Sequence, residues 1–242
     1  MNPINPEILT RINKYLSGSG LFARKQADEL VKQGVVMING QLAKLGDQVA
    51  EGDVVTVDGE VIEPLADDKV VCIALNKPIG VVCTAASSVK NNIIDHVGYS
   101  ERVFPVGRLD KDSQGLILLT NKSGLAEFIL NSEHEHEKEY LVTVDKSITS
   151  EFIQSMSQGV PVLDQVTKPC TVLQESDRVF SITLTQGLNR QIRRMCQYHG
   201  FKVEKLERVR IMHVHLNDLP LGHWRELTVS EISVMLNASL ML

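Results

Sequence analysis

The sequence is poor in cysteine, with four in 242 residues, and none of them form a Cys-x-x-Cys pair. Their wide spacing argues against disulfides and against a metal site, since such a site needs ligands grouped at short intervals. We expect free thiols in a reducing compartment, each acting as a small core residue. The cysteines are Cys72, Cys83, Cys170 and Cys196.

Long apolar stretches are also missing. No apolar run approaches the ~20 residues that a membrane-spanning helix requires. Residues 1–7 have neither a basic start nor an apolar segment, so they do not read as a signal peptide. We therefore expect a cytoplasmic protein with no membrane partner.

An excess of positive charge is absent as well, because the net charge is −5. That value argues mildly against a nucleic-acid partner, but binding depends on where basic residues cluster. Residues 8–50 carry six basic and three acidic side chains, and residues 187–210 carry seven basic and two acidic ones. The segregation permits a basic binding face on an acidic protein.

The first part of the chain has the pattern of a small independent module. Apolar spacing predicts helices over 8–16 and 23–33, followed by a strand at 35–38 and a turn at Asn39-Gly40. A hairpin is expected around Asp58-Gly59. Residues 64–69 combine a proline with a run of charges and are typical of a linker. We therefore place one domain at 1–65 and a second at 66–242.

The second part alternates strands with a few helices, and this order favours an α+β domain on a mainly antiparallel sheet. Strands are expected at 70–75, 81–84, 116–119, 140–144 and 179–184. Helices are expected at 125–130, 151–157 and 189–198, and a capping box from Thr228 to Glu231 opens the last one.

The segment 107–121 holds the densest group of candidate functional residues. A loop with Arg108, Asp110, Lys111 and Asp112 passes through Gly115 into the apolar run 116–119. A carboxylate held at the mouth of a buried strand is constrained and partly desolvated, which suits reaction chemistry.

That segment, GRLD-x-DS-x-GL-x-LLTN, resembles the central motif of pseudouridine synthases. Lys138-Glu139-Tyr140 and the segments 187–195, 205–210 and 76–80 also fit motifs of this family, so the likeness runs from about Arg11 to Leu227. The combination is most similar to the large-subunit (23S) rRNA branch. Some close relatives there carry a long basic C-terminal tail, whereas this sequence ends at Leu242.

The resemblance implies roles for individual residues. Asp110 would be the nucleophile, Tyr140 would stack on the target base, and Arg193 would pair with Asp110 and keep it charged. The implied RNA-contacting residues of this domain are Lys77, Arg108, Leu109, Lys111, Arg190, Gln191, Arg194 and Leu206, the last of them against the base.

The first module resembles a small RNA-binding domain that takes its name from a ribosomal small-subunit protein. The likeness rests on RINKYL, ARKQADELVKQG and VVMING. It implies that Arg11, Lys14, Arg24 and Lys25 face RNA phosphates, which would give salt-dependent and largely sequence-independent affinity.

The implied activity is isomerisation of one uridine of 23S rRNA, after the base is flipped out of its helix. Nothing leaves and no redox change occurs, so no cofactor or metal is expected, and we expect a monomer. A tRNA as second substrate is left open, as is attack by Asp110 on the sugar or on the base. A non-catalytic RNA-binding factor for ribosome assembly is the main alternative. A carboxylate-based hydrolase would need a second, protonated acid, and Asp112 is the only candidate nearby.

Overall fold

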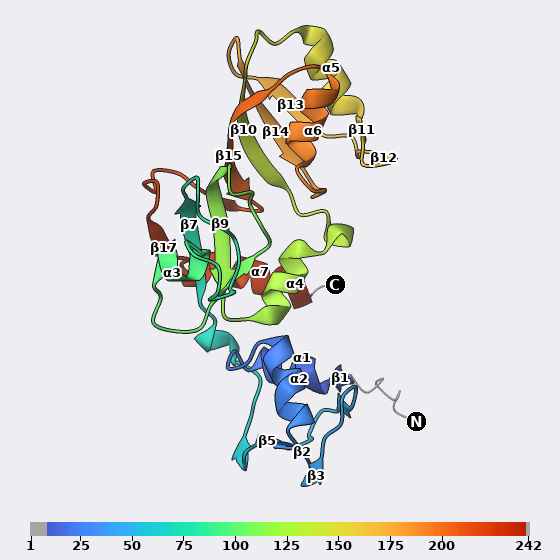
Figure 1. Ribbon diagram of the computed structural model, residues 1–242, viewed down its shortest axis with the longest axis vertical. Helices are drawn as coiled ribbons and strands as arrows, with labels where there is room; N and C mark the ends of the chain where they lie inside the picture. The colour runs from blue at the N-terminus through green and yellow to red at the C-terminus, as the bar shows by residue number, and fades with distance from the viewer. Residues whose placement is uncertain (1–8, 241–242) are drawn as a thin grey trace. The chain divides into compact units, whose positions relative to one another are not determined.

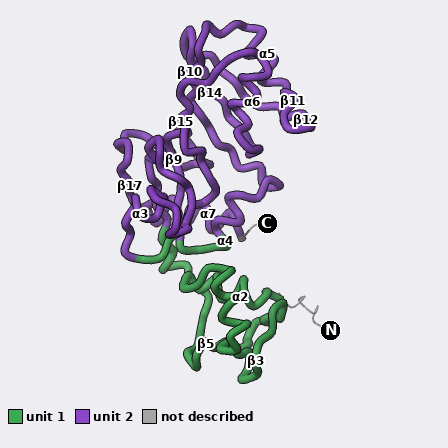
Figure 2. The backbone as a smooth tube through the Cα atoms, in the orientation of Figure 1, with its two compact units in different colours: residues 1–71, 101–103, 121–124 green, residues 72–100, 104–120, 125–242 purple. Residues whose placement is uncertain are grey.

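The computed structural model describes residues 9–240, and its contacts divide the chain into two compact units (Figures 1 and 2). The first unit comprises residues 1–71, 101–103 and 121–124, and the second comprises 72–100, 104–120 and 125–242. Residues 1–7, for which we expect no signal peptide, lie outside the described part. No helix within residues 9–240 has the length and apolar character needed to cross a bilayer.

The smaller unit contains two helices and short strands around an apolar core. Its four-stranded sheet has the order β3-β2-β5-β6, and β1 pairs with β4 separately. The elements are β1 (Thr10–Arg11), α1 (Ile12–Gly18), α2 (Arg24–Lys32), β2 (Val36–Ile38), β3 (Gln41–Leu42), β4 (Gln48–Val49), β5 (Val55–Val57), β6 (Glu60–Val61) and a 3-10 turn η1 (Asp67–Lys69).

Both predicted turns of this unit are present, since Asn39 and Asp58 adopt positive φ and are each followed by a glycine. The first helix differs from the prediction. It starts at Ile12 rather than at residue 8, because Thr10 and Arg11 pair with β4 and the Ile12 amide donates to Asp47 O at 2.8 Å. Ile8 lies outside the described residues.

The larger unit is built on a nine-stranded sheet with the main order β13-β14-β10-β15-β9-β7-β17. Its pairings are antiparallel except for β15 with β9, which are parallel. The predicted α+β class with a mainly antiparallel sheet is confirmed. The strands of this sheet are β7 (Cys72–Lys77), β8 (Phe104–Val106), β9 (Gln114–Thr120), β10 (Lys138–Val144), β13 (Thr171–Gln174), β14 (Val179–Leu184), β15 (Val203–Ile211), β16 (Val214–His215) and β17 (Trp224–Glu226). A separate two-stranded sheet pairs β11 (Pro161–Val162) with β12 (Gln165–Val166).

The helices of this unit cover the sheet and complete its cores. One core joins β10, β13 and β14 to α5 and α6, with Phe152, Phe180 and Met195 in its interior (Figure 1). The helices are α3 (Ile93–Val97), α4 (Ser123–Leu130), the 3-10 turn η2 (Ser132–His134), α5 (Ser150–Gln158), α6 (Gln191–Tyr198) and α7 (Val229–Leu240).

Two local predictions for this unit are wrong. Residues 81–84 form no regular strand and contribute an isolated bridge between Val82 and Asn92, because the chain bends after Gly80, whose φ is +95°. The helix expected over 189–198 begins at Gln191, since Arg190 adopts a left-handed conformation with φ +51°.

The four cysteines are free thiols, and Cys72, Cys83 and Cys196 are buried, as expected of small core residues. Burial raises the pKa of Cys72 and of Cys196 to about 12. The thiols therefore stay protonated at neutral pH, which suits packing rather than nucleophilic chemistry.

Candidate active site

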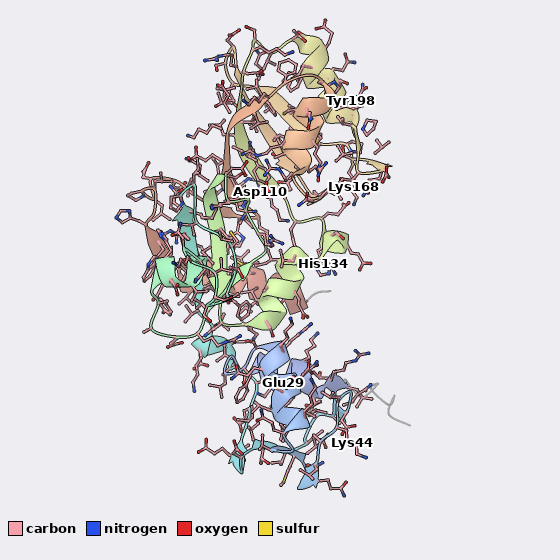
Figure 3. All side chains as sticks on the ribbon, viewed as in Figure 1. Glu29, Lys44, Asp110, His134, Lys168 and Tyr198 are labelled. Carbon is pink, nitrogen blue, oxygen red and sulfur yellow. The ribbon has the colours of Figure 1, made fainter. Side chains whose placement is uncertain are left out.

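The loop that carries Asp110 joins β8 to β9, where β9 enters the centre of the sheet. β9 is buried along Gly115–Thr120 and pairs with β7 on one side and β15 on the other. This buried strand fixes one end of the loop, and Asp110 lies there partly exposed, with 32% of its side chain accessible (Figure 3).

Contacts from three directions hold the main chain of this loop. The Ser113 amide donates to Asp110 O at 3.0 Å, and the Gly80 amide donates to Lys111 O at 2.8 Å. Cys83 Sγ accepts from the Leu109 amide at 3.3 Å and donates to Leu109 O at 3.2 Å. Asp110 is therefore placed by backbone contacts, a positioning that suits a reacting carboxylate.

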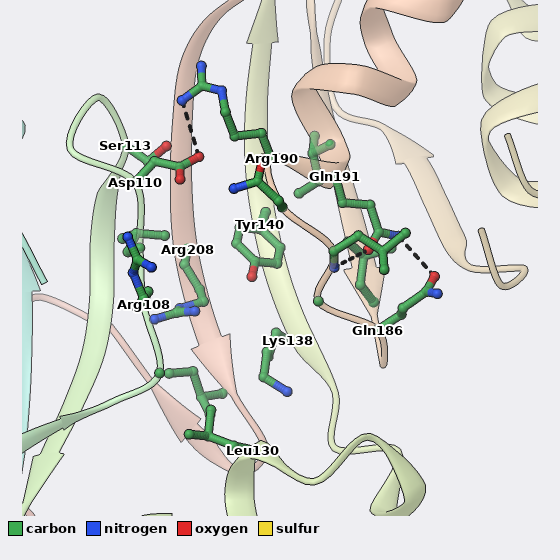
Figure 4. Close-up of a pocket in the computed structure, with 18 of the residues that line it drawn as sticks. Arg108, Asp110, Ser113, Leu130, Lys138, Tyr140, Gln186, Arg190, Gln191 and Arg208 are labelled. Carbon is green, nitrogen blue, oxygen red and sulfur yellow. Dashed lines mark hydrogen bonds and ion pairs between the residues drawn. The ribbon is translucent and has the colours of Figure 1, made fainter. Parts of the chain in front are cut away.

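A cavity of about 520 Å³ opens beside Asp110 (Figure 4). Its walls come from the β8–β9 loop, α4, β10, the loop before α6, and β15, and its volume lies in the usual range for small-ligand sites. Among the described residues that line it, Asp110 is the only carboxylate. The lining also includes Arg108, Leu109, Ser113, Lys138, Tyr140, Arg190, Gln191, Leu206 and Arg208.

An arginine other than the expected one lies against Asp110. Arg190 Nη1 is 3.4 Å from Asp110 Oδ2, and the same guanidinium donates two bonds of 2.9 Å to the carboxylate of Asp112. The bonds from Arg190 hold the pKa of the Asp112 carboxyl below its ordinary value. The Arg190 guanidinium thus contacts both carboxylates, and its contact with Asp112 is bidentate.

The predicted pairing of Arg193 with Asp110 is not what the structure shows. Arg193 Nη2 donates to Asp112 O at 2.9 Å and to Ser113 Oγ at 3.1 Å, and its Nε is 3.6 Å from Asp112 Oδ2. The physical reason is the left-handed turn at Arg190, which directs that side chain to Asp110 and leaves Arg193 one helical turn further along. Arg193 fixes the loop rather than the Asp110 carboxylate.

Lys77 is placed differently from the RNA-contacting role that we expected. Its side chain has no solvent-exposed surface, and its ammonium donates to Pro78 O at 2.9 Å and to Val81 O at 3.0 Å. Burial lowers its pKa below the ordinary lysine value. Lys77 therefore bonds to its own chain, because β7 is buried along its whole length.

Three other residues that we expected to contact RNA either bond to the loop before α6 or lie outside the cavity lining. Gln191 is 4% exposed and accepts a bond of 3.0 Å from the Leu188 amide, so it shapes the loop before α6. Arg194 Nε donates to Asn189 O at 3.0 Å in that same loop. Lys111 is exposed and is not part of the described cavity lining.

The remaining predicted residues divide between the two units. Tyr140 and Leu206 line the cavity with Leu109, and Arg108 is an exposed residue at its edge. In the smaller unit Arg11, Lys14, Arg24 and Lys25 are all exposed.

Four residues that line or support the cavity were given no role at the site from the sequence: Lys138, Arg208, Ser113 and Cys83. A signal existed for Lys138. It lies two residues before Tyr140 on the same strand, and alternate residues of a strand share a face. For Cys83 there was none, because its contact with Leu109 joins positions 26 residues apart.

The alternating glutamates and histidines of residues 133–137 make packing and hydrogen-bond contacts within the fold. His134 and His136 lie against Phe128, with ring centroids 5.0 and 4.5 Å from it, at the C-terminal end of α4 (Figure 3). His134 Nδ1 is 3.1 Å from Phe128 O, and Glu135 pairs with Lys168 at 2.8 Å. The histidines cap and cover the helix end.

Comparison with known proteins agrees with this geometry. Residues 71–198 match the model of the RNA pseudouridylate synthase family, and residues 10–55 match that of the S4 domain. A dual-specificity RNA pseudouridine synthase RluF from Salmonella typhi is 58% identical over 223 residues, covering 92% of this chain and 77% of its own. RluF from Escherichia coli K12 is 57% identical over 227 residues, covering 94% and 78%.

A solved structure gives the same picture. The crystal structure of a pseudouridylate synthase superposes with a TM-score of 0.68 at 29% identity, covering 93% of this chain and 99% of its own. The predicted likeness to the RluF group is confirmed, and the non-catalytic alternative is set aside. The chain therefore belongs to the RNA pseudouridylate synthase family and is an RNA pseudouridine synthase, an isomerase that carries an S4 domain ahead of its catalytic domain.

Proposed function

We propose that this enzyme converts a specific uridine of 23S rRNA to pseudouridine, with Asp110 as the nucleophile and without a cofactor. The observation that carries the proposal is the cavity in which Asp110 is the only carboxylate of the described lining and Tyr140 supplies an aromatic face. A reaction that rearranges one nucleotide needs one nucleophile and a surface for the base, and both are present.

The choice of RNA rests on the relatives. The enzymes from Salmonella typhi and Escherichia coli, at 58% and 57% identity, are named dual-specificity RNA pseudouridine synthases. A dual specificity is consistent with rRNA as one substrate and a tRNA as the other. We infer that the chain acts as a cytoplasmic monomer.

The two family matches suggest a function for each domain. We infer that residues 1–65 form the RNA-binding domain and 66–242 the catalytic domain, which the matches at 10–55 and 71–198 support. The exposed cations Arg11, Lys14, Arg24 and Lys25 would contact phosphates, and Arg108 and Lys111 would do so around the flipped nucleotide.

In the proposed reaction the uridine leaves its helix at a cost of a few kcal/mol and enters the cavity. Tyr140 stacks on the uracil, and Leu206, 6% exposed, closes the apolar wall. Asp110 faces the ribose with Arg190 Nη1 3.4 Å from its Oδ2, and Arg193 holds the loop at Asp112 and Ser113. The excluded water strengthens these electrostatic contacts.

The test is a map of pseudouridines in ribosomal and transfer RNA from cells with and without the gene. We expect loss of one 23S rRNA pseudouridine, and of any tRNA site that shares its specificity. Restoration by the wild-type gene but not by one encoding Asp110→Ala completes the test. An unchanged 23S rRNA map would refute the proposed substrate.

A further inference from the structure

The charges that line the cavity are unevenly distributed. Four cations and one carboxylate, Asp110, are among the described residues that line it, and of these cations only Arg190 is paired with Asp110. In Figure 4 Asp110 and Arg190 lie at one end of the cavity, Tyr140 in the middle, and Lys138 at the other end. The reaction as described above uses Asp110, Arg190 and Tyr140 and gives no task to Lys138 or Arg208.

Lys138 presents its ammonium in the cavity without a carboxylate partner in the described part of the chain. It is half-buried and donates to His136 O at 2.9 Å. Its side chain shares a face of β10 with Tyr140 because the two lie two positions apart on the strand. Burial, with a smaller effect of Arg208, lowers the pKa of Lys138 to about 8.

Arg208 adds a second cation beside the same aromatic ring. It is the Cα partner of Tyr140 across β10 and β15, and its guanidinium carbon is 5.9 Å from the Tyr140 ring centroid. The side chain is 4% exposed, and its Nε donates to Leu116 O at 2.7 Å. Its Nη2 is buried with no hydrogen-bond partner among residues 9–240. An unpaired buried donor is costly, so a ligand atom that accepts from it offsets that cost.

The chemistry creates a negative charge that such cations would stabilise. When the C1′–N1 bond of uridine breaks, the electron pair stays on uracil and spreads over N1 and the two carbonyl oxygens. Asp110 bonds to C1′ as the nucleophile while the C1′–N1 bond breaks. In the return step C5 attacks C1′ with the uracil electron pair, the Asp110–C1′ bond breaks with its pair returning to the carboxylate, C5 loses its proton, and N1 gains one. The net charge is unchanged, but the intermediate uracil is anionic.

We propose that Lys138 and Arg208 form the cationic end of the cavity and stabilise the negative charge on uracil while the glycosidic bond is broken. The inference rests on the proposed function, which places uridine in this cavity with its ribose at Asp110. Fixed donors at the site of developing charge are worth about a hundredfold to a thousandfold in rate each. Lys138 thereby acts as a catalytic residue that contacts the base, and Arg208 supports it.

The first experiment separates chemistry from binding. Single-turnover rates and RNA dissociation constants are measured for wild type, Lys138→Met and Lys138→Arg, using the RNA that the wild-type enzyme modifies. We expect Lys138→Met to lose roughly 100- to 1000-fold in rate with an RNA dissociation constant within about threefold of wild type. Lys138→Arg should recover most of the rate because it keeps the charge.

The control is Lys146→Met, an exposed lysine on the turn after β10 whose ammonium lies 4.3 Å from the Phe201 ring centroid. This variant should retain the wild-type rate. A Lys138→Met rate within threefold of wild type would overturn the proposal. So would a loss confined to RNA affinity, which would make Lys138 a phosphate contact, or an equal loss in Lys138→Arg.

The pH profile gives a second readout. With a pKa near 8, Lys138 is charged below that pH and neutral above it, so the wild-type rate should fall above pH 8. The fall should be absent in Lys138→Arg. The other charged or titratable groups near Lys138 are Tyr140 on the same face of β10, Arg208 on β15 and His136 before β10. Arg108, Asp110 and Arg190 line other parts of the cavity. Burial lowers the pKa of His136 from its ordinary 6.5, so it does not titrate near pH 8.

The same assay distinguishes the two hypotheses. If the wild-type enzyme forms no pseudouridine in any supplied RNA, the proposed function fails, and the role of Lys138, which rests on it, fails with it. If the wild type is active and its profile is flat above pH 8 while Lys138→Met retains its rate, the cationic end of the cavity has no catalytic role.

Discussion

Asp110 and Asp112 lie two residues apart and share the guanidinium of Arg190, yet their surroundings differ. Asp112 receives two bonds of 2.9 Å from Arg190, whereas Asp110 is 3.4 Å from the same group and lines the cavity. The structure thus keeps one carboxylate engaged and leaves the other available. An available, charged carboxylate is the requirement for a nucleophile at neutral pH.

Arg193→Lys tests the loop contacts at this scale. A lysine retains the charge but cannot donate to Asp112 O, Ser113 Oγ and Val203 O together, as Arg193 does. Loss of one or two such bonds, at about 1 kcal/mol each, predicts a single-turnover rate roughly 5- to 30-fold lower. The control is Arg178→Lys, whose exposed side chain lies 3.8 Å from Glu204. Equal rates for both variants would contradict this role.

Residue-level prediction succeeded where the pattern was local. Asp110, Tyr140 and Leu206 were expected together and all line one cavity. It failed for Arg193 because helical spacing does not reveal the left-handed backbone at Arg190. It failed for Lys77 because a basic side chain next to a proline gives no sign that two carbonyls will enclose it.

At the scale of elements, the junction of β9 and β15 depends on one glycine. Gly115 has φ +104°, and a Cβ built there would lie 2.3 Å from Arg208 O. The strands pair in parallel through Arg208 and Gly115 at this point. The close approach of β15 brings Arg208 and Leu206 to the cavity, so a packing feature also positions the site.

Gly115→Ala should therefore destabilise the protein by roughly 3–5 kcal/mol, the range of severe backbone strain and overpacking. Denaturant unfolding measures the change. Gly124→Ala is the matched control, because Gly124 lies in α4 with nothing within 4 Å of an added Cβ. It should be neutral or stabilising by up to about 1 kcal/mol. A stable Gly115→Ala protein would show that the strands can separate at no cost.

The capping box predicted at the last helix is present, and its contacts predict that the free energy of unfolding depends on pH. Glu231 accepts two bonds from Arg225 and one of 2.8 Å from the Thr228 amide. The bonds from Arg225, ahead of those from Thr228, lower the pKa of Glu231 from 4.5 to about 2. A lowered pKa means that the stabilisation is complete above pH 4.5 and is lost as the pH falls towards 2.

Glu231→Gln should accordingly lower the free energy of unfolding by about 1–2 kcal/mol at pH 7, the size of a strong helix cap. The difference from wild type should shrink between pH 4.5 and 2 in denaturant titrations. A difference that stays constant over this interval would show that the carboxylate charge is not involved.

Element-level prediction was accurate for strongly patterned segments, such as β14 and the two glycine hairpins of the smaller unit. The strand that we predicted at 81–84 did not form: the segment has the composition of a strand but no partner strand. Its Val82 amide bonds to Asn91 O, and the Thr84 amide bonds back to Val82 O. Whether such a segment becomes a strand depends on pairing with a distant strand, which the local composition does not reveal.

At the scale of the whole molecule, an acidic protein acts on a polyanion. We expect exposed cations of the smaller unit to supply much of the RNA affinity and to make it salt-dependent. Replacing Arg11 and Lys25, both exposed, with glutamine should weaken RNA binding at every sequence tested. The slope of log affinity against log salt should become shallower by about 1–2. An unchanged slope would place the RNA elsewhere.

The central claim is that the carboxylate of Asp110 performs the isomerisation. The direct measurement is single-turnover pseudouridine formation by Asp110→Asn, which keeps the shape and removes the charge, together with its RNA dissociation constant. The account predicts a rate reduced by at least roughly a thousandfold with affinity within about threefold of wild type. Pseudouridine formation at a rate near that of wild type would contradict it.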